Sequence, residues 1–257
     1  MREAESSREN RAIALGKLAT GRTSGYRSSM KKALVLLTLA LVQSVSAAPP
    51  KDPLMQVKDV EGLPRVLLIG DSISMGYTLQ VRELLKGKAN VHRPPTNCGP
   101  TIKGLAELDQ WLKIGGEDQR WNVIHFNWGL HDLKYIGTNG DRIVPVKSKG
   151  SRQQVPPAAY EKNLRELVKR LKKTGARLIW RNTTPVPTGA RGRVPGDSAK
   201  YNEIAAKIMK DEGVEIHDLY SFALKHTAKI QRKADVHYTA EGSMALAREV
   251  VKALNLE

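Results

Sequence analysis

The stretch "VLLIGDSISMGY", residues 66–77, decides how this chain is interpreted. An apolar run ends there at Gly70, and a serine, Ser72, stands between this run and a segment with helical character. A buried strand that passes directly into a helix is typical of a parallel sheet, and the serine would then lie at the carboxyl end of the strand. Free backbone N–H groups and the positive end of the helix dipole would surround its hydroxyl. Ser72 is therefore either a nucleophile, whose attack creates an oxyanion, or a plain cap of the helix.

The rest of the chain alternates between apolar runs and helical patterns. We expect strands at residues 65–69, 90–92, 121–127, 177–181 and 214–217. We expect helices at residues 76–85, 102–112, 160–172, 198–210 and 239–254. This order predicts an α/β fold, a three-layer α/β/α sandwich around a parallel five-stranded sheet, formed by residues 52–257 as one domain. Long loops are expected to rim the carboxyl edge of that sheet, where ligands bind, and they cover residues 135–157 and 184–196.

The N-terminal region has the pattern of an export signal. Two lysines follow Met30, an apolar run covers residues 33–42, and small residues come next. This run is short for a membrane span, so residues 30–48 are predicted to be a signal peptide rather than an anchor or a buried helix. Residues 1–29 are then an upstream extension or a disordered segment. The expected location is secreted or periplasmic, with no stable membrane span after cleavage.

The composition limits the class of protein. An apolar content of 40% suits a soluble domain with a sizeable core. The single cysteine, Cys98, excludes a disulfide within the chain and a zinc site made of cysteines. The formal net charge of +16 attracts anions, although solubility is the simpler explanation for it. With 5% aromatic residues and no RNA-binding signature, no nucleic-acid partner is expected.

Three further polar stretches are expected at the same edge as Ser72. "NCGPT" contains Gly99, "GLHD" contains His131, and "ADVHYTAEG" contains Asp235 and His237. A serine nucleophile needs a base, and an acid and an imidazole two residues apart in a loop can supply and orient one. Taken alone, each stretch also has a purely structural explanation, such as a turn or a histidine in solvent. Their coincidence at one edge favours a catalytic site.

In their order along the chain, these four stretches resemble the sequence blocks of the GDSL/SGNH hydrolase superfamily. The resemblance implies a flavodoxin-like fold with strand order 2-1-3-4-5. It implies cleavage of esters of lipids, sugars or polysaccharides, without a metal or another cofactor. It also implies Ser72 as the nucleophile and His237 as its base, with an oxyanion hole that uses the backbone N–H groups of Ser72 and Gly99.

Two positions depart from the pattern of that superfamily. The third block normally supplies an asparagine side chain to the oxyanion hole, and His131 stands there instead. An imidazole N–H can substitute for the amide, as can the nearby Asn127. The acid normally stands three residues before the histidine, where this chain has Ala234. Asp235, two residues before the histidine, is the candidate acid, with a backbone carbonyl as the alternative.

The predicted function is a serine esterase that acts on acyl, and most simply acetyl, esters of a carbohydrate. Candidate substrate-binding residues flank the site, and they are Asp71, Trp128, Tyr238 and Arg191. The two aromatic rings either stack on a sugar or cover the sheet. Arginines are also expected to attract an anionic sugar polymer, and the candidates are Arg152, Arg181, Arg191 and Arg193. Two alternatives stay open, a relative that binds carbohydrate and has lost turnover, and an acyltransferase to a sugar; the oligomeric state stays open as well.

Overall fold

The computed structural model describes residue 54 and residues 57–116, 120–140 and 142–256. The predicted extension at residues 1–29 and the predicted signal peptide at residues 30–48 lie outside this part of the chain. Both stay predictions, and so does the location that they imply.

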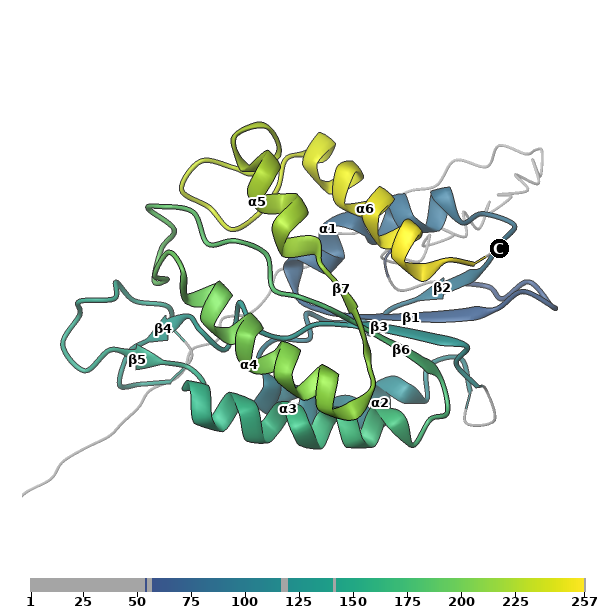
Figure 1. Ribbon diagram of the computed structural model, residues 1–257, viewed down its shortest axis with the longest axis horizontal. Helices are drawn as coiled ribbons and strands as arrows, with labels where there is room; N and C mark the ends of the chain where they lie inside the picture. The colour runs from purple at the N-terminus through teal and green to yellow at the C-terminus, as the bar shows by residue number, and fades with distance from the viewer. Residues whose placement is uncertain (1–53, 55–56, 117–119, 141, 257) are drawn as a thin grey trace, which may run out of the picture. The chain divides into compact units, whose positions relative to one another are not determined.

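A five-stranded sheet, parallel throughout, forms the centre of the fold (Figure 1). Its strands are β1 (Arg65–Ile69), β2 (Asn90–His92), β3 (Val123–Phe126), β6 (Arg177–Arg181) and β7 (Glu215–His217). They lie in the order β2-β1-β3-β6-β7, which is the order that the resemblance implies. In register, Val66 of β1 lies opposite Val91 on one side and Val123 on the other. Every residue of β1 is buried, because the strand is paired along both edges and covered on both faces.

Helices cover both faces of the sheet, which confirms the three-layer α/β/α sandwich. Figure 1 shows α1, α5 and α6 on one face and α2, α3 and α4 on the other. Their bounds are α1 (Ser72–Leu84), α2 (Thr101–Leu112), α3 (Pro157–Lys172), α4 (Asp197–Glu212), α5 (Leu219–Ile230) and α6 (Ala240–Leu254). None of the helices in the described part of the chain combines the length and the hydrophobicity needed to cross a lipid bilayer.

Three elements differ from the prediction. Helix α1 begins at Ser72, four residues before the predicted start. Helix α5 was not predicted, and its buried face is narrow, with Leu219, Ala223 and Ile230 as its buried residues. The loop predicted at residues 135–157 contains a short antiparallel hairpin of β4 (Tyr135–Ile136) and β5 (Arg152–Gln153). A two-residue strand is too short to show the alternation by which strands are recognised in a sequence.

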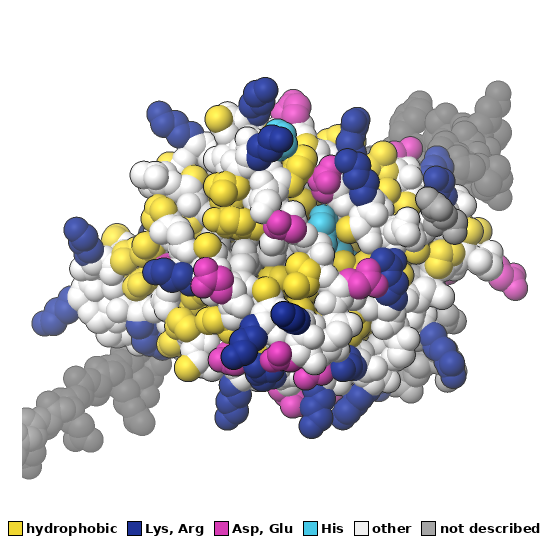
Figure 2. All heavy atoms as spheres, in the orientation of Figure 1, with side chains coloured by type: hydrophobic (Ala, Val, Ile, Leu, Met, Phe, Trp, Pro, Cys, Tyr) yellow, Lys and Arg dark blue, Asp and Glu magenta, His cyan; other side chains and the backbone are white. Residues whose placement is uncertain are grey.

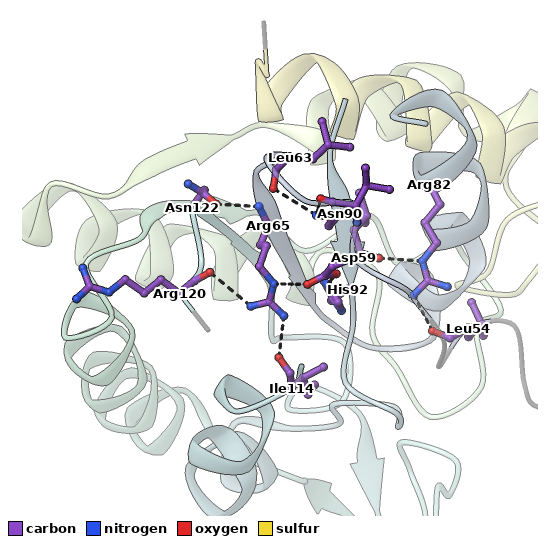
Figure 3. A network of polar contacts seen from close by, with 12 residues as sticks. Leu54, Asp59, Leu63, Arg65, Arg82, Asn90, His92, Ile114, Arg120 and Asn122 are labelled. Carbon is purple, nitrogen blue, oxygen red and sulfur yellow. Dashed lines mark hydrogen bonds and ion pairs between the residues drawn. The ribbon is translucent and has the colours of Figure 1, made fainter. Parts of the chain in front are cut away.

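A polar network ties the segment before β1 to the amino end of the sheet (Figure 3). The Asp59 carboxylate contacts Arg65 Nε at 2.8 Å and His92 Nε2 at 2.6 Å. The Arg65 guanidinium also donates to the carbonyl of Ile114 at 3.0 Å and lies over the Trp121 ring, 4.2 Å from its centroid. Burial lowers the pKa of His92, and the attraction of Asp59 only partly offsets that effect. His92 is therefore a neutral hydrogen-bond donor in this network.

Candidate active site

Three side chains that the sequence groups together are in hydrogen-bonding contact beside the carboxyl end of β1. Ser72 Oγ lies 2.8 Å from Nε2 of His237, which stands 165 positions later in the chain. On the other side of the same ring, Nδ1 lies 2.7 Å from Oδ1 of Asp235. This arrangement has the order of groups needed to remove a proton from the serine hydroxyl.

The turn between β1 and α1 holds the serine at the first position of the helix. Gly70 is required by space, because a Cβ there would lie 2.7 Å from the Cβ of Ser74. The next residue, Asp71, caps the helix through a hydrogen bond from the backbone N of Ile73 to Oδ1 at 3.0 Å. Because its side chain is buried, Asp71 holds the turn, and the expectation that it contacts substrate is not supported. Asp71 thus engages two N–H groups of the first turn, those of Ile73 and Met75, through its side chain and its carbonyl.

The histidine comes from a tight reversal of the chain at residues 231–238. The backbone N of Arg232 donates to the carbonyl of His237 at 2.9 Å. Between them, Ala234 has a φ of +53°, a left-handed conformation that is uncommon for a residue with a Cβ. After this turn, Oδ1 of Asp235 accepts from the backbone N of His237 at 3.1 Å as well as from the ring. An acid two residues before the histidine therefore reaches the same ring nitrogen that orients a catalytic imidazole.

The protonation of this pair follows from its contacts. The side chains of Asp235 and His237 are 40% and 42% exposed. Partial burial opposes ionisation of Asp235, but hydrogen bonds from the backbone and ring of His237 outweigh it and lower the pKa of this carboxyl below its usual value. An ionised Asp235 fixes the proton of the neutral imidazole on Nδ1. Nε2 is then the acceptor that faces the hydroxyl of Ser72.

His131 is held as a neutral imidazole beside this site. Burial is the main cause that lowers its pKa to about 4. The positive charges of Lys134 and Arg193 and the proximity of His237 act in the same direction, while Asp71 opposes them. A neutral imidazole has one N–H, so His131 keeps a single donor throughout the neutral pH range.

The loop that carries Gly99 is locked by short hydrogen bonds. Gly99 has a φ of +60°, a conformation that favours glycine. Its N–H donates to Oδ1 of Asn97 at 3.0 Å, and Lys103 Nζ donates to the carbonyl of Asn97 at 2.9 Å. A substrate oxygen that accepts from the Gly99 N–H has to share this donor with Oδ1 of Asn97 or displace that oxygen.

Asn127 is engaged in a buried network and does not serve the site directly. Its Nδ2 donates to the carbonyl of Arg181 at 2.7 Å and to Oγ1 of Thr183 at 3.2 Å, and its Oδ1 accepts from the Arg181 guanidinium at 2.7 Å. We therefore assign Asn127 no oxyanion role. Arg181 is 1% exposed, so the expectation that it attracts a polymer is wrong; its guanidinium ties the ends of β3 and β6 together.

The aromatic candidates are buried as well. Trp128 is 1% exposed and packs on Phe126 with ring centroids 6.0 Å apart, which favours the second of its two alternatives, covering the sheet, over stacking on a sugar. Tyr238 is 5% exposed and contributes only a small surface to the site. Arg191 is exposed on the loop at residues 184–196 and stays a candidate.

A groove of about 550 Å³ opens beside the serine, between the amino ends of α1 and α6. It contains residues that the sequence analysis did not single out, and these are Met75, Gln80, Arg232 and Ser243. The sequence does contain a pattern that indicates part of this lining. Ser72, Gly76 and Gln80 recur at every fourth position and therefore share one face of α1.

The described residues contain no group of three or more His, Cys, Asp or Glu side chains that could hold a metal ion. Most histidines there are already accounted for by protein contacts. His125 Nε2 and His217 Nδ1, for example, lie 3.1 Å apart within the sheet.

The strand order and the serine–histidine contact at the carboxyl edge define the class of SGNH-type hydrolases. A family model described as the GDSL-like lipase/acylhydrolase family matches residues 68–245, and the chain belongs to this family. It is accordingly a hydrolase of the SGNH type. No curated protein sequence gives a significant match.

Several solved structures share the fold at low sequence identity. An acetyl xylan esterase, AlAXEase, is 16% identical with a TM-score of 0.57, over 74% of this chain and 99% of the other. Axe2, an acetylxylan esterase from Geobacillus stearothermophilus, is 18% identical with a TM-score of 0.59, over 76% and 95%. A lipase/acylhydrolase from Enterococcus faecalis is 17% identical with a TM-score of 0.58, over 75% and 95%. These similarities support the fold.

Proposed function

We propose that this protein is a serine esterase that removes acyl groups, most simply acetyl groups, from a carbohydrate. The observation that carries the proposal is the chain of hydrogen bonds from Ser72 through His237 to Asp235. Ser72 and His237 line a groove large enough for a small-molecule ligand.

In the proposed reaction, His237 Nε2 takes the proton of the Ser72 hydroxyl as Oγ attacks the ester carbonyl. The proton then passes from His237 to the leaving sugar oxygen, which leaves an acyl group on Ser72. Water attacks this acyl-enzyme with His237 again as the base, and acetate and free serine result. Asp235 keeps the imidazole in the required tautomer and stabilises its positive charge.

The tetrahedral oxyanion is proposed to bind three donors. These are the backbone N–H groups of Ser72 and Gly99 and the ring N–H of His131. Since His131 replaces an amide with an imidazole of low pKa, its contribution is that of a neutral donor. The Asn97 oxygen yields the Gly99 N–H to the stronger, charged acceptor.

The groove offers hydrogen-bonding groups to a polar alcohol. Its lining includes Gln80, Thr239 and Ser243, whose side chains can form hydrogen bonds with sugar hydroxyls. Two of the solved structures with this fold bear the name acetyl xylan esterase, which supports acetylated carbohydrate as the first substrate to test. The signal-like segment at residues 30–48 adds the proposal that the protein works outside the cytoplasm.

The experiment is acetate release from acetylated xylo-oligosaccharides and from 4-nitrophenyl acetate, with Ser72→Ala as the matched control. The proposal expects turnover by the native protein and its loss in the variant. Binding of the oligosaccharide without acetate release would instead support a carbohydrate-binding relative. Acetyl transfer to an added acceptor sugar, in preference to water, would identify an acyltransferase.

A further inference from the structure

The charged side chain that lines the groove beside Ser72 is positive. Among the described residues, no aspartate or glutamate side chain lines it, and Arg232 is its one arginine or lysine. Glu241, in the first turn of α6, lines a neighbouring groove instead. An anion in the groove beside Ser72 would therefore meet a cation and no lining carboxylate.

The position of Arg232 is fixed relative to the base. Its backbone N donates to the carbonyl of His237 at 2.9 Å, and its own carbonyl accepts from the backbone N of Asp235 at 3.3 Å. The side chain is exposed, and within the described part of the chain it has no ion-pair partner within 4.0 Å. Asp235, the carboxylate that its charge affects, is already hydrogen-bonded to the ring of His237. The guanidinium is thus available to a ligand in the groove.

Two helix termini meet at the same groove, and a carboxylate stands at each of them, Asp71 at α1 and Glu241 at α6. Ser72 begins α1, a helix of 13 residues, and Ala240 begins α6, a helix of 15 residues, and both line it. The amino end of a helix carries partial positive charge. Figure 2 shows Lys and Arg spread over the visible face with acidic residues between them, so the charge on that face does not select one place for an anion. Arg232 does, because it is the one lysine, arginine, aspartate or glutamate in the described lining of this groove.

The size of the groove indicates which part of a substrate lies there. An acetyl group would fill only a small part of a volume of about 550 Å³, which is in the range of pockets that hold whole small-molecule ligands. The sugar portion of the ester therefore occupies the groove. We propose that Arg232 is a specificity-determining residue that binds an anionic substituent, a carboxylate or a sulfate ester, on this sugar. The inference rests on the proposed esterase function.

The test compares three acetylated oligosaccharides of equal length, one neutral, one with a uronic acid and one with a sulfate ester. The kcat/KM of each is measured at low and high ionic strength for the native protein and for Arg232→Gln. Lys233→Gln is the matched control, because it removes the same charge from the next exposed residue, which does not line the groove. A single exposed ion pair predicts a preference of about two- to fivefold for the acidic sugar, through KM and weakened by salt.

In Arg232→Gln this preference should fall to about one, while Lys233→Gln should keep it. A preference for the uronic acid alone, or for the sulfate alone, would identify the anion. Equal kcat/KM on acidic and neutral sugars in the native protein would overturn the inference, and so would a preference that survives in Arg232→Gln. Calorimetric binding of the same sugars to Ser72→Ala reports on Arg232 even without turnover. A failure of the esterase function is thereby separated from a failure of the anion site.

Discussion

The described part of the chain contains two hydrogen-bonded aspartate–histidine pairs, with nearly equal contact distances, in very different places. Asp59 and His92 lie 2.6 Å apart at the amino end of the sheet (Figure 3), and Asp235 and His237 lie 2.7 Å apart before α6. The side chain of His92 is 6% exposed, whereas that of His237 is 42% exposed. The short contact is common to both pairs, so it does not by itself indicate catalysis.

The two pairs differ in which ring nitrogen contacts the carboxylate. They also differ in what the rest of each imidazole ring contacts. Asp59 contacts Nε2 of His92, and its second oxygen is held by Arg65. The His92 ring packs edge-on against Trp121, with centroids 5.3 Å apart. In the other pair the carboxylate contacts Nδ1 of His237, which leaves Nε2 for Ser72. The first pair therefore holds the fold together, and we propose that only the second acts as a base.

The largest effect that would test this comparison concerns the two histidines. His237→Ala should lower kcat by about ten-thousandfold or more, because the nucleophile loses its base. His92→Ala should leave kcat within a few fold of the native value, since its ring contacts Asp59 and Trp121, which are not part of the candidate site. Steady-state acetate release measures both. A similar loss in the two variants would remove the distinction.

Substitution of the two carboxylates should also lower kcat at Asp235 and leave kcat unchanged at Asp59. Asp235→Asn should reduce kcat by roughly a hundred- to a thousandfold, because the amide no longer fixes the tautomer or stabilises the imidazolium. The effect is expected to be smaller than the loss of His237 because solvent reaches this pair. Asp59→Asn is the control, and its kcat should match that of the native enzyme. Unchanged kcat in Asp235→Asn would point to a backbone carbonyl as the orienting group.

His131 extends the comparison, because its ring is proposed to donate a hydrogen bond to the oxyanion, whereas His237 accepts a proton. His131→Ala should lower kcat by about a hundred- to a thousandfold, the usual loss for one oxyanion donor. His131→Asn restores an N–H donor and should recover most of the activity. With a pKa of about 4, His131 stays neutral from pH 6 to pH 8, so its replacement should not shift the pH profile in that range. An active His131→Ala enzyme would contradict the proposed role.

The stability of the fold should respond in the opposite order. Asp59→Ala removes a partner from two largely buried groups, Arg65 and His92, and should lower the free energy of unfolding by about 2 kcal/mol. Asp235→Ala acts on a half-exposed pair and should cost less than about 1 kcal/mol. Urea denaturation followed by circular dichroism gives both values. A larger cost at position 235 would mean that the reversal before α6 depends on its hydrogen bonds.

The last of these effects is a pH dependence of stability. Burial lowers the pKa of His92 in the folded state below 6.5, the ordinary value that it has in the unfolded chain. The unfolded chain therefore binds the extra proton below that pH. This part of the stability is present above pH 6.5 and is lost as the pH falls, by at most about 1.4 kcal/mol per pH unit. His92→Gln should flatten the slope of unfolding free energy between pH 7 and pH 5. An unchanged slope would show that other histidines determine it.

The parts of the molecule that could be predicted are those encoded in local pattern. The apolar run before Ser72 specified β1, and the spacing of Tyr160, Leu164 and Leu171 specified α3, because each burial pattern is continuous in sequence. Helix α5 escaped prediction because only three of its residues are buried. The placement of Ser72 and His237 on one edge followed from the topology of a parallel sheet.

Features that depend on distant residues could not be predicted in the same way. Arg232 faces Ser72 across a groove that exists only after α1 and α6 pack together. The burial of Trp128 also depends on tertiary packing, since a Cβ on Gly104 of α2 would come within 2.9 Å of its ring. Neither the shared groove of Arg232 and Ser72 nor the packing of Trp128 on Gly104 can be predicted from a short segment of sequence, because the residues of each pair lie far apart in the chain.

The most direct test of the central claim is covalent labelling with a fluorophosphonate, followed by intact-mass measurement and peptide mapping. The native protein should give one adduct, located at Ser72, which is lost in Ser72→Ala and forms much more slowly in His237→Ala but at an unchanged rate in His92→Ala. An adduct at another residue, or equal labelling rates in the two histidine variants, would contradict the central claim.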